Sequence, residues 1–128
     1  MASKRVLVID DSNTIRRSAE IFLKQGGHEV MLAEDGFDAL AKVNDAQPDL
    51  IFCDILMPRL DGYQTCAIIK RNEKFAATPV VMLSYKDGVF DKARGRMGGS
   101  QEYLTKPFTK DQLLQAMQQF GAANQGAV

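Results

Sequence analysis

The sequence predicts an α/β fold, in which a parallel sheet of five strands is covered by helices on both faces. The first observation is a set of short apolar runs that are continuous rather than alternating, as is typical of parallel strands buried on both sides. The second is that segments with the apolar spacing of amphipathic helices separate these runs. This alternation of strand and helix calls for right-handed crossovers between parallel neighbours.

The expected strands are short apolar runs of about four residues, a length that favours strand over buried helix. They lie at residues 6–9, 30–33, 50–53 and 80–83, with a weaker fifth strand at 103–104. The first four have the composition expected of central, fully covered strands.

Helical spacing of apolar residues marks the segments between the strands. The apolar faces of the first three are formed by Ile15, Ala19, Phe22 and Leu23, by Phe37, Leu40 and Ala41, and by Tyr63, Cys66 and Ile69. Gly26 and Gly27 end the first helix, and Pro48 follows the second. The fourth helix, near residues 87–97, is the weakest because Gly95 lies inside it.

The fifth helix has the clearest start signal. Thr109 and Gln112 have the spacing of a capping box, and Phe108 can pack against Leu113 as a hydrophobic staple. Its apolar face is then formed by Leu113, Leu114, Met117 and Phe120.

Five such strand–helix units predict a doubly wound, flavodoxin-like sheet with strand order 2-1-3-4-5. We expect one domain at residues 4–120, a flexible C-terminal tail at 121–128, and no output domain after the fifth helix.

Composition argues against several classes of function, although it does not exclude DNA binding. The 16 basic and 16 acidic residues balance, so no overall field favours nucleic acid or an anionic membrane. No apolar stretch approaches the ~20 residues of a membrane span, and no signal peptide is present, which predicts a soluble, cytoplasmic protein. Cys53 and Cys66 match no metal spacing and are interpreted as reduced core residues.

Carboxylates follow two of the expected strands. Asp10 and Asp11 end the first strand, and Asp54 ends the third. In the predicted order these strands are neighbours at the point where strand order reverses, which is where ligands bind in open α/β sheets. Three carboxylates so close repel one another unless a cation joins them, and an all-oxygen ligand set favours Mg²⁺ over zinc. The alternative is that Asp10 or Asp11 only caps the helix that opens at Ser12.

Three more residues are predicted at the same edge of the sheet. Ser84 ends the fourth strand, and Lys106 follows the fifth and precedes Pro107, whose peptide bond can be cis and so fix the direction of the lysine. Tyr103 lies within the fifth strand. Each has a simpler alternative: a turn serine, a solvated surface lysine and a half-buried strand aromatic.

Metal, carboxylate, hydroxyl and amine together suit a phosphoryl group. A carboxylate can act as nucleophile and form an acyl phosphate. The transition state then asks mainly for positioning and for positive charge near the phosphoryl oxygens, which Mg²⁺, Lys106 and the Ser84 hydroxyl would supply. These arguments alone do not select which aspartate is the nucleophile.

The ordered set of motifs resembles the receiver domain of bacterial two-component response regulators. The matching elements are DD at 10–11, Asp54 within DILMPRLDG, Ser84, and YLTKPF at 103–108. The resemblance implies that Asp54 accepts a phosphoryl group from a histidine kinase. It further implies that Asp10, Asp11, Asp54 and the main-chain carbonyl of Leu56 hold Mg²⁺. Ser84 and Lys106 would contact the phosphoryl oxygens. Tyr103 would be the switch aromatic, whose ring turns inward when Ser84 moves toward the phosphoryl group.

A narrower resemblance implies the pathway. DGFDALAK, MPRLDGYQTC, FDKARGR and YLTKPF look like the stand-alone receivers of the chemosensory system that governs type IV pili and twitching motility. The output would then be altered affinity for partner proteins through the face formed by the fourth helix, the fifth strand and the fifth helix. A monomer or weak dimer is expected. The downstream target is not implied.

Two positions depart from the usual receiver pattern. Tyr85 stands where receivers usually carry a small residue, so its ring could crowd the path that Tyr103 would use. Leu56, two residues after Asp54, cannot orient an attacking water, which predicts slow self-dephosphorylation.

Other functions remain as alternatives. The chain could be a receiver that drains phosphate from a shared kinase, or an aspartyl-phosphate phosphatase, although Leu56 replaces the second aspartate of the D-x-D motif of such enzymes. A flavin-binding flavodoxin is disfavoured because the first loop, DDSNTIRR, is acidic rather than Gly-rich. A silent scaffold is disfavoured because every expected chemical group is present. We therefore predict a signalling switch and not an enzyme acting on a separate substrate.

Overall fold

The computed structural model describes residues 3–85 and 102–121, in which strands and helices alternate as predicted. The elements are β1 (Arg5–Ile9), α1 (Asn13–Gln25), β2 (Glu29–Ala33), α2 (Gly36–Ala46), β3 (Leu50–Asp54), α3 (Gly62–Arg71), a 3-10 turn (Glu73–Phe75), β4 (Val80–Tyr85), β5 (Glu102–Lys106), α5 (Lys110–Ala116) and a π-helical turn (Met117–Gly121). The predicted fourth helix at 87–97 and most of the predicted tail lie outside the described residues.

The sheet has five parallel strands in the order β2-β1-β3-β4-β5, which confirms the predicted topology. The register places Ile9 opposite both Ala33 on β2 and Cys53 on β3. Asp10 follows Ile9 and Asp54 follows Cys53, so the two aspartates leave adjacent strands at the same level. Sheet pairing therefore determines the position of the candidate site.

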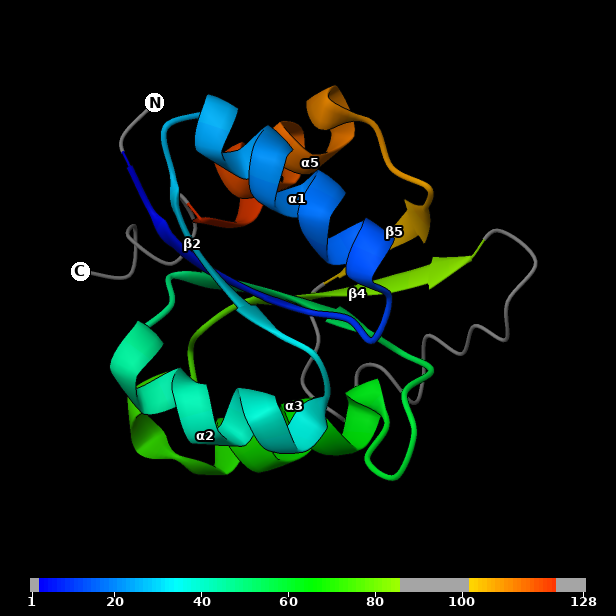
Figure 1. The fold of residues 1–128 in the computed structure, drawn as a ribbon. Helices are drawn as coiled ribbons and strands as arrows, with labels where there is room; N and C mark the ends of the chain where they lie inside the picture. Colours follow the sequence, from blue (N-terminus) through cyan, green and yellow to red (C-terminus); the bar gives the residue numbers. More distant parts are fainter. Residues whose placement is uncertain (1–2, 86–101, 122–128) are drawn as a thin grey trace.

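Helices cover both faces of the sheet. Figure 1 shows α1 and α5 on one side and α2 and α3 on the other. Two buried clusters correspond to these layers, and consecutive strand residues alternate between them: Leu7 and Ile9 belong to one, Val6 and Val8 to the other. This alternation explains why the strands read as continuous apolar runs, because both sets of side chains are buried.

At the start of each described α-helix, the side chain of the N-cap residue accepts a hydrogen bond from a backbone N–H of the first turn. Thr109 and Gln112 form the predicted capping box at the start of α5, and Asp61 with Gln64 forms a second one at α3, which was not predicted. Gly26 is the C-cap of α1, as expected, and Gly27 follows with a φ of +87°. No helix within residues 3–85 and 102–121 has the length and apolar content of a membrane span.

The strands extend beyond their apolar runs. β5 covers five residues where only Tyr103 and Leu104 were apolar enough to predict a strand, because pairing with β4 extends it to Lys106. Both cysteines are buried thiols, as predicted. Burial raises the pKa of the Cys66 thiol to about 11 and raises that of the Cys53 thiol well above its ordinary value, so both are protonated at neutral pH.

Candidate phosphoryl-transfer site

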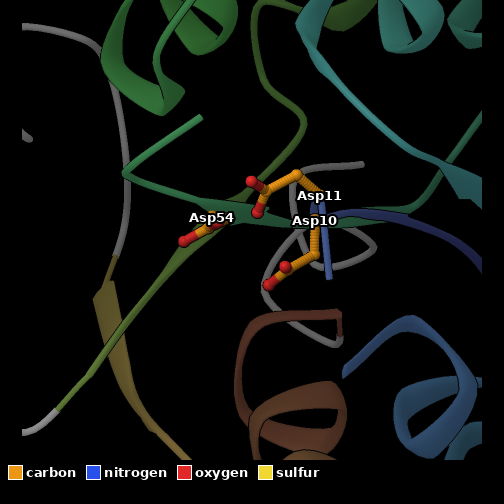
Figure 2. A group of neighbouring side chains, drawn as sticks. All are labelled: Asp10, Asp11 and Asp54. Atoms are coloured by element: carbon orange, nitrogen blue, oxygen red, sulfur yellow. The ribbon is translucent and has the colours of Figure 1, made fainter. Parts of the chain in front are cut away.

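Three aspartates meet at the carboxyl end of the sheet. Carboxylate oxygens of Asp10, Asp11 and Asp54 all lie within 4.8 Å of one another, and Figure 2 shows the three side chains converging from the ends of β1 and β3. Asp10 and Asp54 are buried, whereas Asp11 is exposed. The predicted meeting of these residues is confirmed.

A glycine permits the close packing behind Asp54. Gly62 opens α3, and a Cβ at this position would lie 2.2 Å from the main-chain oxygen of Asp54. The Gly62 N–H donates to the carbonyl of Ile55 over 2.8 Å, which ties the start of α3 to the end of β3. Any larger residue would push this helix away from the strand that ends in Asp54. Sequence reasoning did not single out Gly62, although the Asp-Gly pair after MPRL was available as a signal.

The first aspartates do not cap α1. The N-cap is Ser12, whose hydroxyl accepts from the N–H of Ile15 over 3.3 Å. Asp10 instead accepts from the N–H of Ser12 over 2.9 Å, and its carbonyl accepts from Arg16 over 2.6 Å. The capping alternative is therefore wrong, and the Asp10 carboxylate still has an oxygen that faces the cluster. Arg16, which supports this turn, was not predicted because no local pattern links it to Asp10.

Lys106 reaches into the cluster from the last strand. Its Nζ donates to Asp10 Oδ2 over 3.1 Å and to Asp54 Oδ1 over 3.0 Å, and only 2% of the residue is exposed. It is therefore not the solvated surface lysine of the alternative interpretation. Its peptide bond to Pro107 is cis.

Negative charge exceeds positive charge in the cluster. Burial, and then the neighbouring Asp10 carboxylate, raise the pKa of Asp54 to about 7, although Lys106 opposes this. Burial likewise raises the pKa of Asp10, against its hydrogen bond from Ser12 and the charge of Lys106. Burial lowers the pKa of Lys106, but its two carboxylate partners raise it by more. The single ammonium therefore offsets only part of the burial and repulsion that raise the pKa values of the two carboxylates.

The donor set fits a hard divalent cation. All three acidic side chains offer oxygen, and a second positive charge would offset the repulsion that raises the pKa of Asp54. Oxygen-only ligands suit Mg²⁺, Ca²⁺ or Mn²⁺ better than zinc. The cluster can therefore hold such an ion.

A cleft of about 210 Å³ opens beside the aspartates. It is lined by Asp11, Ser12, Asp54, Ile55, Leu56, Leu83, Ser84, Tyr85 and Lys106. Ser84 is buried and its hydroxyl donates to the carbonyl of Tyr85 over 3.3 Å, while the Leu56 side chain projects outward and is 62% exposed. The structure thus brings the predicted Ser84, Leu56 and Lys106 to one cleft with Asp54.

Tyr103 does not line this cleft. It lines a separate groove of about 240 Å³ between β5 and α5, together with Gln112 and Phe120 among others. Half-buried, it packs against the core cluster on the α2 and α3 side of the sheet. The structure therefore places the predicted switch residue on β5, outside the cleft that holds Asp54.

Comparison with known proteins identifies the family. Residues 6–118 match the family described as the response regulator receiver domain. The chain is a receiver domain. Protein PilG of Pseudomonas aeruginosa is 65% identical over 113 residues, which cover 88% of this chain and 84% of the relative. Protein PilH of the same species is 35% identical over 113 residues, covering 88% of this receiver and 93% of the relative.

Solved structures agree with this assignment. The chemotaxis protein CheY4 of Vibrio cholerae superimposes on this receiver with a TM-score of 0.86 at 34% identity, covering 94% of this chain and 98% of that one. The fold and the family thus rest on both sequence and structural similarity.

One side chain at the receiver's cleft has a position that was not predicted. The Tyr85 ring centroid lies 4.4 Å from the Nζ of Lys106, and Tyr85 is 52% exposed. The ring thus covers the ammonium from the solvent side. Sequence reasoning anticipated a bulky ring after Ser84 but considered only its effect on Tyr103.

Proposed function

We propose that this receiver domain accepts a phosphoryl group on Asp54 from a histidine kinase in a magnesium-dependent reaction. The observation that supports it best is the Asp54 carboxylate at the base of an open cleft, 3.0 Å from the buried Lys106 ammonium and within the cluster of three carboxylates. A nucleophile, a fixed cation and a metal-ligand set thus share one cleft.

Asp54 supplies the nucleophile in the proposed transfer. A carboxylate oxygen forms a bond to phosphorus as the phosphorus–nitrogen bond of the donor phosphohistidine breaks, and the electron pair returns to the imidazole, which takes up a proton. Lys106 and the Ser84 hydroxyl contact the phosphoryl oxygens, where charge accumulates during transfer. For this purpose Ser84 gives up its present hydrogen bond to the Tyr85 carbonyl.

The proposed magnesium ligands are Asp10, Asp11, Asp54 and the main-chain carbonyl of Leu56. When bound, the ion would neutralise phosphoryl and carboxylate charge together. The surplus of carboxylates over ammonium groups in the cluster supports this assignment.

Phosphorylation would alter binding of partner proteins through β5, α5 and the segment near residues 87–97, with Tyr103 and Ser84 as the switch pair. The position of Tyr103 on β5, which pairs with the strand that carries Ser84, supports this. We place the protein in regulation of type IV pili and twitching motility, because its motifs resemble receivers of that system and it is 65% identical to Protein PilG. Residues 4–120 form the receiver, which modifies itself and turns over no separate substrate.

The decisive experiment is labelling by acetyl phosphate and by histidine kinases of the same organism, with mass spectrometry to locate the phosphate. We expect stoichiometric, magnesium-dependent labelling that Asp54→Ala abolishes. Asp45→Ala, which removes an exposed carboxylate near the C-terminal end of α2 and outside the cleft, is the matched control and should be labelled like the wild type. Undiminished labelling of Asp54→Ala would contradict the proposal, and multiple turnover of free phosphate esters would favour the phosphatase alternative.

A further inference from the structure

Tyr85 contacts the buried cation of the phosphoryl site. We propose that it is a positioning residue, whose ring holds the Lys106 ammonium against Asp10 and Asp54 through a cation–π contact. The contact itself is independent of the proposed function. Its effect on phosphoryl transfer to Asp54 rests on that function. The ring centroid lies 4.4 Å from Nζ, within the range in which a cation is attracted to an aromatic face.

The ammonium has room for three partners, and the structure provides three. A lysine ammonium carries three N–H donors. Two of them donate to Asp10 Oδ2 at 3.1 Å and Asp54 Oδ1 at 3.0 Å, which leaves one for the ring. Lys106 is only 2% exposed, whereas Tyr85 is 52% exposed. One side of the ring therefore faces solvent, and the other side occupies the place that water would otherwise take beside the ammonium.

Sheet register makes this contact a property of the fold. Tyr85 on β4 and Lys106 on β5 are directly paired in the parallel ladder, and Ser84 pairs with Thr105 one step before. Side chains of paired residues lie on the same face of a sheet as neighbours. The residue at position 85 therefore faces Lys106 on account of the strand pairing.

An aromatic partner suits a lysine that must serve an incoming anion. The face of the ring attracts the ammonium without being an anion itself, so it adds no charge that would repel the incoming phosphoryl oxygens. As the phosphoryl group bonds to Asp54, the ammonium can exchange a carboxylate for a phosphoryl oxygen and keep its contact with the ring. A leucine at this position would cover the ammonium but would not attract it.

The contact can be tested without any phosphodonor. The ε-methylene protons of Lys106 should show an upfield ring-current shift in ¹H–¹³C spectra of lysine-labelled protein, with the signal assigned by its loss in Lys106→Arg. We expect the shift in the wild type and in Tyr85→Phe, and its absence in Tyr85→Leu. A wild-type spectrum without the shift would overturn the contact.

The effect of the contact on phosphoryl transfer is tested by rates of labelling with acetyl phosphate, measured over a magnesium titration that reaches saturation. We expect Tyr85→Leu to lower the transfer rate constant about threefold to tenfold, with the magnesium concentration for half-maximal rate changed far less, and Tyr85→Phe to restore the rate. Phe37→Leu is the matched control. It removes a ring that is equally exposed, at 52%, and that lies 5.2 Å from the Arg59 guanidinium carbon, outside the cleft.

The outcomes separate the two proposals. If Tyr85→Leu is labelled as fast as the wild type, or if Tyr85→Phe is as slow as Tyr85→Leu, the ring does not position Lys106 and the inference is overturned. If the wild type shows the ring-current shift and takes up no phosphate, the contact stands and the proposed function of the site fails.

Discussion

Asp54 is buried beside a second buried carboxylate, and this makes its ionised form costly. The burial of Asp54 and the neighbouring Asp10 outweigh the ion pair with Lys106, so its pKa rises to about 7. The unfolded reference is 3.8, and a group whose pKa is raised on folding stabilises the fold at low pH. That contribution is lost as the pH rises from about 4 through about 7.

We therefore predict that Asp54→Asn stabilises the metal-free protein in a pH-dependent way. In the presence of a chelator, the free energy of unfolding should exceed that of the wild type by on the order of 1–3 kcal/mol at pH 8 and by less at pH 5. Urea denaturation at the two pH values measures this difference. Asp45→Asn, at an exposed site, serves as the control and should show no such trend. An equal difference for Asp54→Asn at both pH values would contradict the ionisation argument.

Leu56 lines the cleft beside Asp54, the proposed phosphorylation site. Its side chain lines the cleft, is 62% exposed and offers no group that could orient a nucleophilic water. We predict that Leu56→Asn accelerates loss of phosphate from the labelled protein about tenfold, because a positioned amide can orient the water. The decay of radiolabelled protein after removal of the donor measures this rate. An unchanged decay rate would count against the role assigned to position 56.

The helix α2 ends at a glutamine in the left-handed conformation, where glycine is usual. Gln47 has a φ of 46° and a ψ of 55°, and its N–H donates to the Val43 carbonyl over 3.0 Å. This left-handed conformation is unfavourable for a residue with a Cβ and is usually given to glycine at a helix end. Pro48 follows directly, which is why the sequence predicted the end of the helix but not its conformation.

Replacement of this residue tests the cost of the conformation. We predict that Gln47→Gly increases the free energy of unfolding by about 0.5–1 kcal/mol, because relief of the left-handed strain exceeds the added flexibility of the unfolded chain. Gln47→Ala is the matched control, since it loses the same side-chain amide but keeps the strain. Thermal or urea denaturation of the three proteins measures the effect. A glycine variant no more stable than the alanine variant would refute it.

Most elements with a local signal were predicted from the sequence, whereas the full length of a strand extended by pairing was not. The capping box of Thr109 and Gln112 requires only residues within one turn, and it was confirmed. By contrast, the first four residues of β5 are exposed or half-buried, and the extension of the strand to Lys106 is due to the ladder with β4. The second capping box, at Asp61 and Gln64, had the same local signal and was overlooked.

At the scale of the whole molecule, topology explains which parts of the site were foreseeable. The strand order alone places Asp10 and Asp54 side by side, so their meeting followed from the sequence once the order was predicted. The pairing of Tyr85 with Lys106 depends on the register of β4 and β5, and no single-residue pattern specifies that register. Gly62 and Arg16 support the aspartates through packing and a hydrogen bond that only the folded chain reveals.

The ion pair between Lys106 and Asp10 joins positions 96 residues apart, and this separation has a consequence for biosynthesis. A ribosome synthesises all three aspartates of the cluster well before it adds the lysine. A nascent chain that stops short of position 106 lacks both the counter-charge and the strand that delivers it. Under the proposed function, unfinished translation products therefore hold the acidic groups without the lysine that would contact the phosphoryl oxygens.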